Sequence, residues 1–192
     1  MAAYLHPAYR AAPAIKGIRV FLQSGPDEWG SYPGSSTPLS AKLALVGFVG
    51  LCLLVGAADA TLVTGSLRPW YASLIHPPGT PPDWVFGSVW GVLYVMLGVA
   101  GWLVWRRAGA GGALRLWGWQ LAVNAMWTPA FFGLHKPVLA LAVIAVLLAL
   151  VALTIHRFAR VQRLAAALMV PYFAWIGYAA WLNLAFWWLN PA

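Results

Sequence analysis

The chain has 192 residues, of which 62% are hydrophobic and only 8% are charged, and its formal net charge is +8. A soluble domain of this size needs far more charge to cover its surface, so the composition excludes that class and predicts a membrane protein. The positive charge does not indicate nucleic-acid binding, because the basic residues lie in short segments between apolar runs.

Residues 1–40 differ from the rest of the chain, being rich in Ala, Pro, Gly and Ser. They contain no long apolar stretch, which excludes a standard secretory signal peptide. Two interpretations stay open for this extension, a disordered tail and a targeting segment, and the tail is favoured. Residues 41–190 then form one membrane domain.

The first two apolar spans of this domain cover about Ala41–Thr64 and Trp84–Trp105. Each is long enough to cross a hydrocarbon core, which takes about 20 helical residues. Between them, Gly65–Asp83 is predicted to be a loop because it is dense in proline. Pro82 stands where the second helix can begin, since proline is favoured at the first helical position.

Three further spans cover about Leu116–Leu134, Val138–His156 and Leu164–Leu189. Pro129 lies inside the third span and predicts a kink there. No alternating pattern typical of a transmembrane barrel is present, so the spans are predicted to be helices. The predicted fold is therefore an all-α membrane protein, a bundle of five transmembrane helices.

Five spans place the two termini on opposite sides of the membrane. The N-terminal side then carries ten of the twelve basic residues, and the other side carries only Arg68 and Lys136. By the positive-inside rule the N-terminus is cytoplasmic. This asymmetry fits a bacterial inner membrane, and the N-terminal extension also fits an organelle membrane.

The chain contains thirteen tryptophans. Tryptophan anchors helix ends at a membrane interface or lines a pocket for a flat apolar ligand. In the third span, Gln120, Asn124, Trp127 and Phe131 share one helical face. Amides inside a membrane helix need a partner or a cavity, so this face either binds a ligand or bonds neighbouring helices, and the two readings weigh equally.

Two more spans carry aromatic stripes, which could enclose a flat pocket or simply pack the bundle. The residues on these stripes are Trp90, Tyr94 and Leu97 in the second span, and Trp175, Ala179 and Leu182 in the fifth. Gly118 and Ala122 form a small-xxx-small pair in the third span, and Gly87 and Gly91 form one in the second. Such pairs allow close helix contact and often dimerisation.

Catalytic and metal-binding patterns are missing from the sequence. Asp59 and Asp83 are the only acidic residues near the spans, and both are expected near a membrane surface. The four histidines lack the spacing of metal ligands, and no phosphate loop or nucleophile motif occurs. We therefore expect a binding protein that has no catalytic residues, no metal site and no required cofactor.

Three motifs in order resemble one known family. The first runs from Pro69, Trp70 and Tyr71 through Pro81 and Pro82 to Trp84, Trp90 and Tyr94. The second joins Gln120, Asn124, Trp127, Pro129 and Phe131, and the third joins Pro171, Tyr172, Trp175, Leu182 and Asn183. Together they resemble the tryptophan-rich sensory protein family (TspO/MBR), also called translocator protein or peripheral benzodiazepine receptor, over about residues 41–190.

The resemblance implies a five-helix membrane receptor, commonly a homodimer, that binds tetrapyrroles such as protoporphyrin IX or haem. It implies that the pocket is lined by Trp90, Tyr94, Asn124, Trp127, Trp175, Ala179 and Leu182. It implies a lid around Trp70, Tyr71, Pro81 and Pro82, and a dimer contact at Gly118 and Ala122. The implied function is tetrapyrrole sensing, linked to tetrapyrrole regulation or stress.

Two alternative functions stay open. One is light-dependent degradation of protoporphyrin, for which the resemblance implicates Trp90 and Trp175. The other is transport of a tetrapyrrole or lipid. The chain departs from the family pattern at two lid positions, where His76 replaces a usual Lys and Gly79 replaces a usual Trp. Loss of that tryptophan weakens the expected contact between the loop and a tetrapyrrole.

Overall fold

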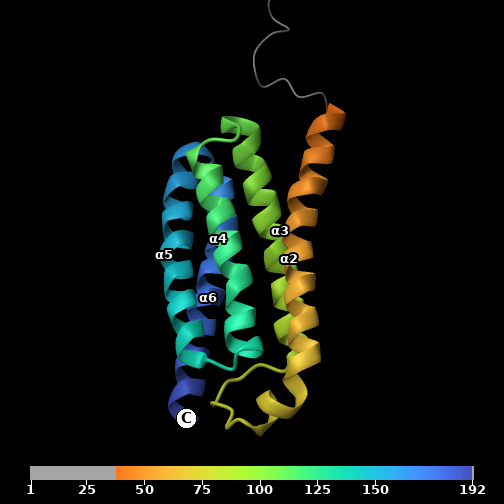
Figure 1. The fold of residues 1–192 in the computed structure, drawn as a ribbon. Coiled ribbons are helices and arrows are strands. Elements are labelled where there is room, and N and C mark those ends of the chain that lie inside the picture. The colour runs from red at the N-terminus through yellow and green to blue at the C-terminus, as the bar shows by residue number, and fades with distance from the viewer. Residues whose placement is uncertain (1–37, 192) are drawn as a thin grey trace, which may run out of the picture. The chain divides into compact units, whose positions relative to one another are not determined.

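The computed structural model describes residues 38–191, except for the side chains of Pro38 and residues 65–69. The predicted N-terminal extension therefore lies almost wholly outside the described part. All regular elements within it are helical, and Figure 1 shows the helices running side by side. They are α2 (Pro38–Ser73), α3 (Asp83–Ala108), α4 (Gly112–Thr128), the π-helix η2 (Pro129–Gly133), α5 (Pro137–Val161) and α6 (Arg163–Leu189).

Four of these helices are long and apolar enough to cross a membrane. The membrane-spanning parts are Leu39–Thr64, Asp83–Ala108, Pro137–Val161 and Arg163–Leu189. α4 has 17 residues, the lower end of the range for a spanning helix, and η2 follows it directly. The prediction of an all-α membrane protein is confirmed by these helices.

The first helix is longer than the sequence analysis predicted. α2 continues to Ser73, so its last turns occupy part of the segment expected to be a loop. The prolines that suggested a loop begin to interrupt the chain only at Pro77 and Pro78. The actual connection to α3 is the short segment 74–82, which we call the α2–α3 loop.

Pro129 changes the helix type rather than simply bending the helix. Proline has no N–H to donate to the preceding turn, and a wider turn begins at this residue. The Leu134 N–H donates to the Pro129 carbonyl at 2.8 Å, which closes the wide turn. His135 then adopts a left-handed conformation, with φ of 54°, before α5 begins at Pro137.

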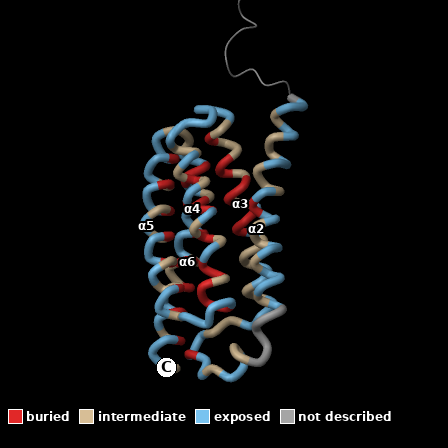
Figure 2. The backbone as a smooth tube through the Cα atoms, in the orientation of Figure 1, coloured by how far each residue is buried: buried red, intermediate tan, exposed pale blue. Residues whose placement is uncertain are grey.

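Buried residues gather on the inward faces of the helices, and the outer faces are exposed (Figure 2). Many exposed residues are large and apolar, including Leu43, Val46 and Val146. An outer apolar surface of this kind suits contact with lipid tails. α2 packs mainly against α3, whereas α5 packs against both α4 and α6.

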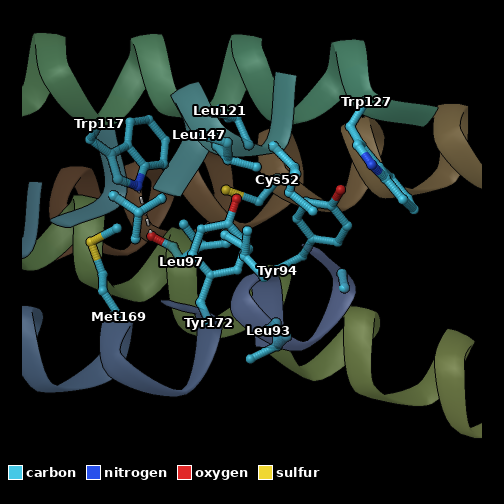
Figure 3. Packing of buried hydrophobic residues seen from close by; sticks show 14 of the residues in the cluster. Cys52, Leu93, Tyr94, Leu97, Trp117, Leu121, Trp127, Leu147, Met169 and Tyr172 are labelled. Carbon is cyan, nitrogen blue, oxygen red and sulfur yellow. Dashed lines mark hydrogen bonds between the residues drawn. The ribbon is translucent and has the colours of Figure 1, made fainter. Parts of the chain in front are cut away.

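The core contains few polar contacts among its apolar side chains. Figure 3 shows Cys52, Leu147 and Tyr172 within it, and Trp117 donates from its indole N–H to the Leu97 carbonyl at 3.1 Å. Cys52 is a fully buried free cysteine. Several residues of this core, including Tyr94 and Trp127, also line the cavity described next.

Candidate functional site

A cavity of about 1150 Å³ opens among α2, α3, the α4–η2 segment and α6, and the α2–α3 loop contributes to one end of it. Pockets for small molecules commonly hold about 300–1,000 Å³, so this space can accept a large ligand. Its aromatic lining comprises Tyr71, Phe86, Trp90, Tyr94, Trp127, Phe131, Phe132 and Phe186.

Stacked rings form two of the cavity walls. On α3, the ring centroids of Trp90 and Tyr94 lie 5.4 Å apart with an interplanar angle of 29°. At the α4–η2 junction, Trp127 and Phe131 lie 5.7 Å apart at 22°. These pairs come from residues four apart along a helix, the spacing that brings side chains together on one face. Each pair presents a flat surface to the cavity.

A polar cluster lies among these aromatic walls. The Tyr94 hydroxyl is 2.7 Å from Asn124 Oδ1 and 3.1 Å from Asp59 Oδ2. Thr128 is a second hydrogen-bond partner of the Asp59 carboxylate. Three helices thus contribute polar groups to one point of an otherwise apolar cavity, which suits a ligand with an apolar body and a few polar atoms.

Asn183 fixes the orientation of the Trp127 indole. The Trp127 N–H donates to Asn183 Oδ1 at 3.3 Å, and the Asn183 amide donates to the Pro137 carbonyl at 2.8 Å. This chain of bonds joins α4, α6 and the start of α5. Since both side chains of the pair are buried, the indole plane is held in place before any ligand binds.

The α2–α3 loop is tied to α6 at two points. Asn190 accepts a hydrogen bond from the Ile75 N–H at 2.8 Å and donates to the Ile75 carbonyl at 3.2 Å. The Tyr178 hydroxyl donates to the Gly79 carbonyl. Gly79 has φ of 88°, a backbone conformation that favours glycine. A tryptophan at this position would strain the loop backbone.

Tyr71 closes the cavity beside the loop. The His76 imidazole Nε2 lies 3.1 Å from the Tyr71 carbonyl, and the two rings meet edge to face. Burial, with the nearby Asp83 carboxylate as a second cause, raises the pKa of Tyr71 to about 12. The phenol therefore stays neutral at physiological pH.

The structure brings most of the expected pocket residues together. The cavity is lined by Trp90, Tyr94, Asn124, Trp127, Ala179 and Leu182. Trp175 does not line it. This indole packs against Phe86, with ring centroids 5.7 Å apart, and its N–H has no hydrogen-bond partner in the described chain. Gln120 shares the helix face of Asn124 but is fully buried outside the cavity.

The expected lid residues divide between helix and loop. Tyr71 and Pro81 line the cavity, whereas Trp70 and Pro82 do not. Trp70 lies in the last turns of α2, where its ring stacks on His135 at 4.3 Å between centroids. This contact joins the end of α2 to the turn between η2 and α5.

The expected dimer residues lie on the outer side of α4. Ala122 is exposed and Gly118 is half-buried, and a Cβ placed on Gly118 would meet nothing within 4 Å. Trp119, on the same helix, is 67% exposed. Gly87 and Gly91 also have open space around them, so these two glycines do not mark a helix contact within the described chain.

Sequence reasoning missed the role of Asp59. The sequence analysis expected Asp59 near a membrane surface and gave it no role, whereas its carboxylate contacts Tyr94 at the middle of α3 and lines the cavity. An acidic residue within an apolar span was a signal of function in itself. Phe86, Phe132 and Phe186 were also missed, because aromatic residues are common in the second, third and fifth spans.

Comparison with known proteins identifies the family of this chain. The sequence profile of the TspO/MBR family matches residues 48–189, which include every helix that contributes to the cavity. The chain belongs to the TspO/MBR family. Its four apolar helices and this membership make it an integral membrane protein.

Relatives come from bacteria and animals. Tryptophan-rich protein TspO of Chlorobaculum tepidum is 37% identical over 153 residues, which cover 78% of this chain and 97% of the relative. The tryptophan-rich sensory protein of Cereibacter sphaeroides is 39% identical over 132 residues, or 67% of this chain and 84% of the relative. The translocator protein of Bos taurus is 36% identical over 147 residues, or 74% and 87% respectively.

Proposed function

We propose that this TspO/MBR protein is a membrane receptor that binds a tetrapyrrole, protoporphyrin IX or haem, in the cavity described above. The observation that carries the proposal is a cavity of about 1150 Å³ whose walls are stacked aromatic pairs. A flat macrocycle gains most from such walls, because offset stacking of rings adds to the burial of apolar area.

Polar groups in the cavity would orient the macrocycle. Asn124 supplies an amide beside Trp127, and Tyr94 supplies a hydroxyl beside Trp90. Among the side chains that the structure describes, no Lys or Arg lines the cavity. We therefore place the propionates of a tetrapyrrole toward the α2–α3 loop, where Tyr71, Pro81 and His76 form the lid and water is accessible.

The proposed receptor crosses the membrane five times. α4 and η2 together form the remaining crossing, and the N-terminus lies in the cytoplasm, as the ten-to-two distribution of basic residues predicts. We further propose that two copies pair through α4, with Gly118 and Ala122 at the contact. The open space around Gly118 supports close helix approach there.

A dark titration with protoporphyrin IX tests the proposal. Purified full-length protein in detergent is titrated while tryptophan fluorescence is followed. Trp127→Ala and Asn124→Ala should each raise the Kd for protoporphyrin at least about tenfold, because each removes a wall or an orienting group of the cavity. Trp188→Ala is the matched control, since Trp188 is 79% exposed and does not line the cavity.

Equal affinity in Trp127→Ala, Asn124→Ala and the control would place the ligand elsewhere. Absence of saturable quenching in folded wild-type protein would remove tetrapyrroles as the ligand.

Light-dependent degradation of protoporphyrin is a second candidate, favoured by the position of Trp90 in the cavity wall. Trp175 packs against Phe86 and does not line the cavity, so the two indoles are not equivalent partners for a bound macrocycle. Trp90→Phe should therefore slow porphyrin loss under illumination more than Trp175→Phe does. Loss of porphyrin absorbance at the same rate without protein would eliminate this activity.

A further inference from the structure

Asp59 is an acidic side chain in the apolar stretch Leu39–Thr64 of α2. A carboxylate at such a position is costly unless it meets partners, and residues of this kind commonly mark a ligand or ion site. Asp59 is half-buried and lines the cavity that the aromatic walls enclose. We therefore expect Asp59 to have a role in addition to helix packing.

The hydrogen bonds that reach Asp59 do not use up its capacity. An ionised carboxylate offers about four acceptor positions. Tyr94 and Thr128 carry one hydroxyl hydrogen each, and the Tyr94 hydroxyl also contacts Asn124 at 2.7 Å. At least two acceptor positions are therefore left for another donor.

Space for that donor exists on the cavity side. Two residues next to Asp59 along the cavity wall, Ala57 and Ala60, are small. The aromatic faces of Trp90 and Tyr94 lie beside the polar cluster. A cation near an aromatic face gains a further electrostatic attraction from the ring.

The charge of the cavity has one sign. Asp59 and Asp83 line it, and no Lys or Arg does so among the described side chains. Among the described side chains, His76 is the one basic group on this lining. A ligand cation thus meets acceptors and aromatic faces, whereas a ligand anion placed beside Asp59 meets a carboxylate.

We propose that the cavity contains a cation-recognition site, in which Asp59 binds the protonated amine of a ligand whose flat aromatic body stacks on the cavity walls. This site goes beyond tetrapyrrole binding and does not depend on it. It makes Asp59 the residue that discriminates ligands by charge, with Tyr94 and Thr128 holding the carboxylate in place.

Three pyrene probes with the same aromatic body test the proposal. They are pyrenylmethylammonium, pyrene carboxamide and pyrene carboxylate, which are cationic, neutral and anionic at neutral pH. Full-length protein in nanodiscs of zwitterionic phosphatidylcholine is titrated with each probe, and the saturable energy transfer from tryptophan to pyrene is measured. The zwitterionic lipid avoids a charge preference of the membrane itself.

The wild-type protein should bind the ammonium probe at least about tenfold more tightly than the carboxylate probe, with the carboxamide between them. Asp59→Asn keeps the shape and an acceptor oxygen but removes the charge. It should bring the ammonium-to-carboxylate affinity ratio close to one and leave carboxamide affinity unchanged. Asp83→Asn removes the second cavity carboxylate and should lower this ratio less than Asp59→Asn does. Arg157→Gln, a charge change at an exposed residue outside the cavity, is the control and should keep the wild-type ratio.

The proposal is overturned if wild-type protein shows no preference for the ammonium probe, a result that needs no variant. It is also overturned if Asp59→Asn keeps the wild-type ratio, because Asp59 then serves only to hold Tyr94. If Asp83→Asn abolishes the preference for the ammonium probe and Asp59→Asn does not, charge selection occurs at the end of the cavity near the α2–α3 loop. Protoporphyrin titration of the same samples reports on tetrapyrrole binding separately.

Discussion

The backbones of α2 and α3 approach each other closely at Gly98. A Cβ at this position would lie 2.6 Å from the Val49 Cα and 2.8 Å from the Val49 nitrogen. Both atoms belong to the backbone of α2, so they cannot move away as the end of a flexible side chain can. Gly98→Ala must therefore push α2 away from α3.

The expected loss of stability follows from two opposing effects. Overpacking an interior costs about 1–3 kcal/mol, whereas alanine favours a helix over glycine by up to about 1 kcal/mol. The net loss in the free energy of unfolding is about 1–2 kcal/mol, which lowers Tm by roughly 2–8 °C for a chain of this size. Thermal unfolding in detergent, followed by circular dichroism, measures this shift.

Gly91→Ala provides the matched control. Gly91 lies on the same helix, and a Cβ there would meet nothing within 4 Å. Its substitution should leave Tm unchanged or raise it slightly. If Gly98→Ala is as stable as Gly91→Ala, the contact between α2 and α3 is not the rigid backbone approach that we infer.

Two other substitutions test the polar groups of the cavity. In Gly56→Ala, the added Cβ would lie 2.6 Å from ring carbons of Tyr94, so the ring must shift. Protoporphyrin affinity, measured by fluorescence quenching, should therefore fall. Unchanged affinity would show that Tyr94 does not orient the ligand. Asn183→Leu removes the bonds to Trp127 and Pro137 and should cost about 1–3 kcal/mol of stability; an unchanged Tm would show that these bonds contribute no net stability.

Local sequence patterns were sufficient to predict the helices and several pocket residues. Asn124 and Trp127 share a face because helical periodicity is set by the backbone alone, and both line the cavity, whereas Gln120 on the same face does not. The start of α3 after Pro82 follows equally from the fixed φ of proline. These features need no knowledge of the neighbouring helices.

Features that depend on how the helices pack were decided only by the tertiary structure. α2 continues to Ser73 because its last turns are covered by η2 and α6, through contacts such as Trp70 with Phe131 and Tyr71 with Phe186. Trp175 packs against Phe86 of α3 and does not line the cavity, although it lies on the predicted aromatic stripe of the fifth span. These contacts between helices cannot be predicted from the sequence on either side of the residues that make them.

Asp59 shows most directly what the sequence determines and what the tertiary structure determines. The sequence determined that a carboxylate occurs within an apolar span, and it determined that tyrosine and asparagine occur in two other spans. Only the packing of α2, α3 and α4 brings these three side chains to one point of the cavity. The rotation of each helix about its axis is set by the fit of all its neighbours, and that fit is a property of the whole bundle rather than of any one segment.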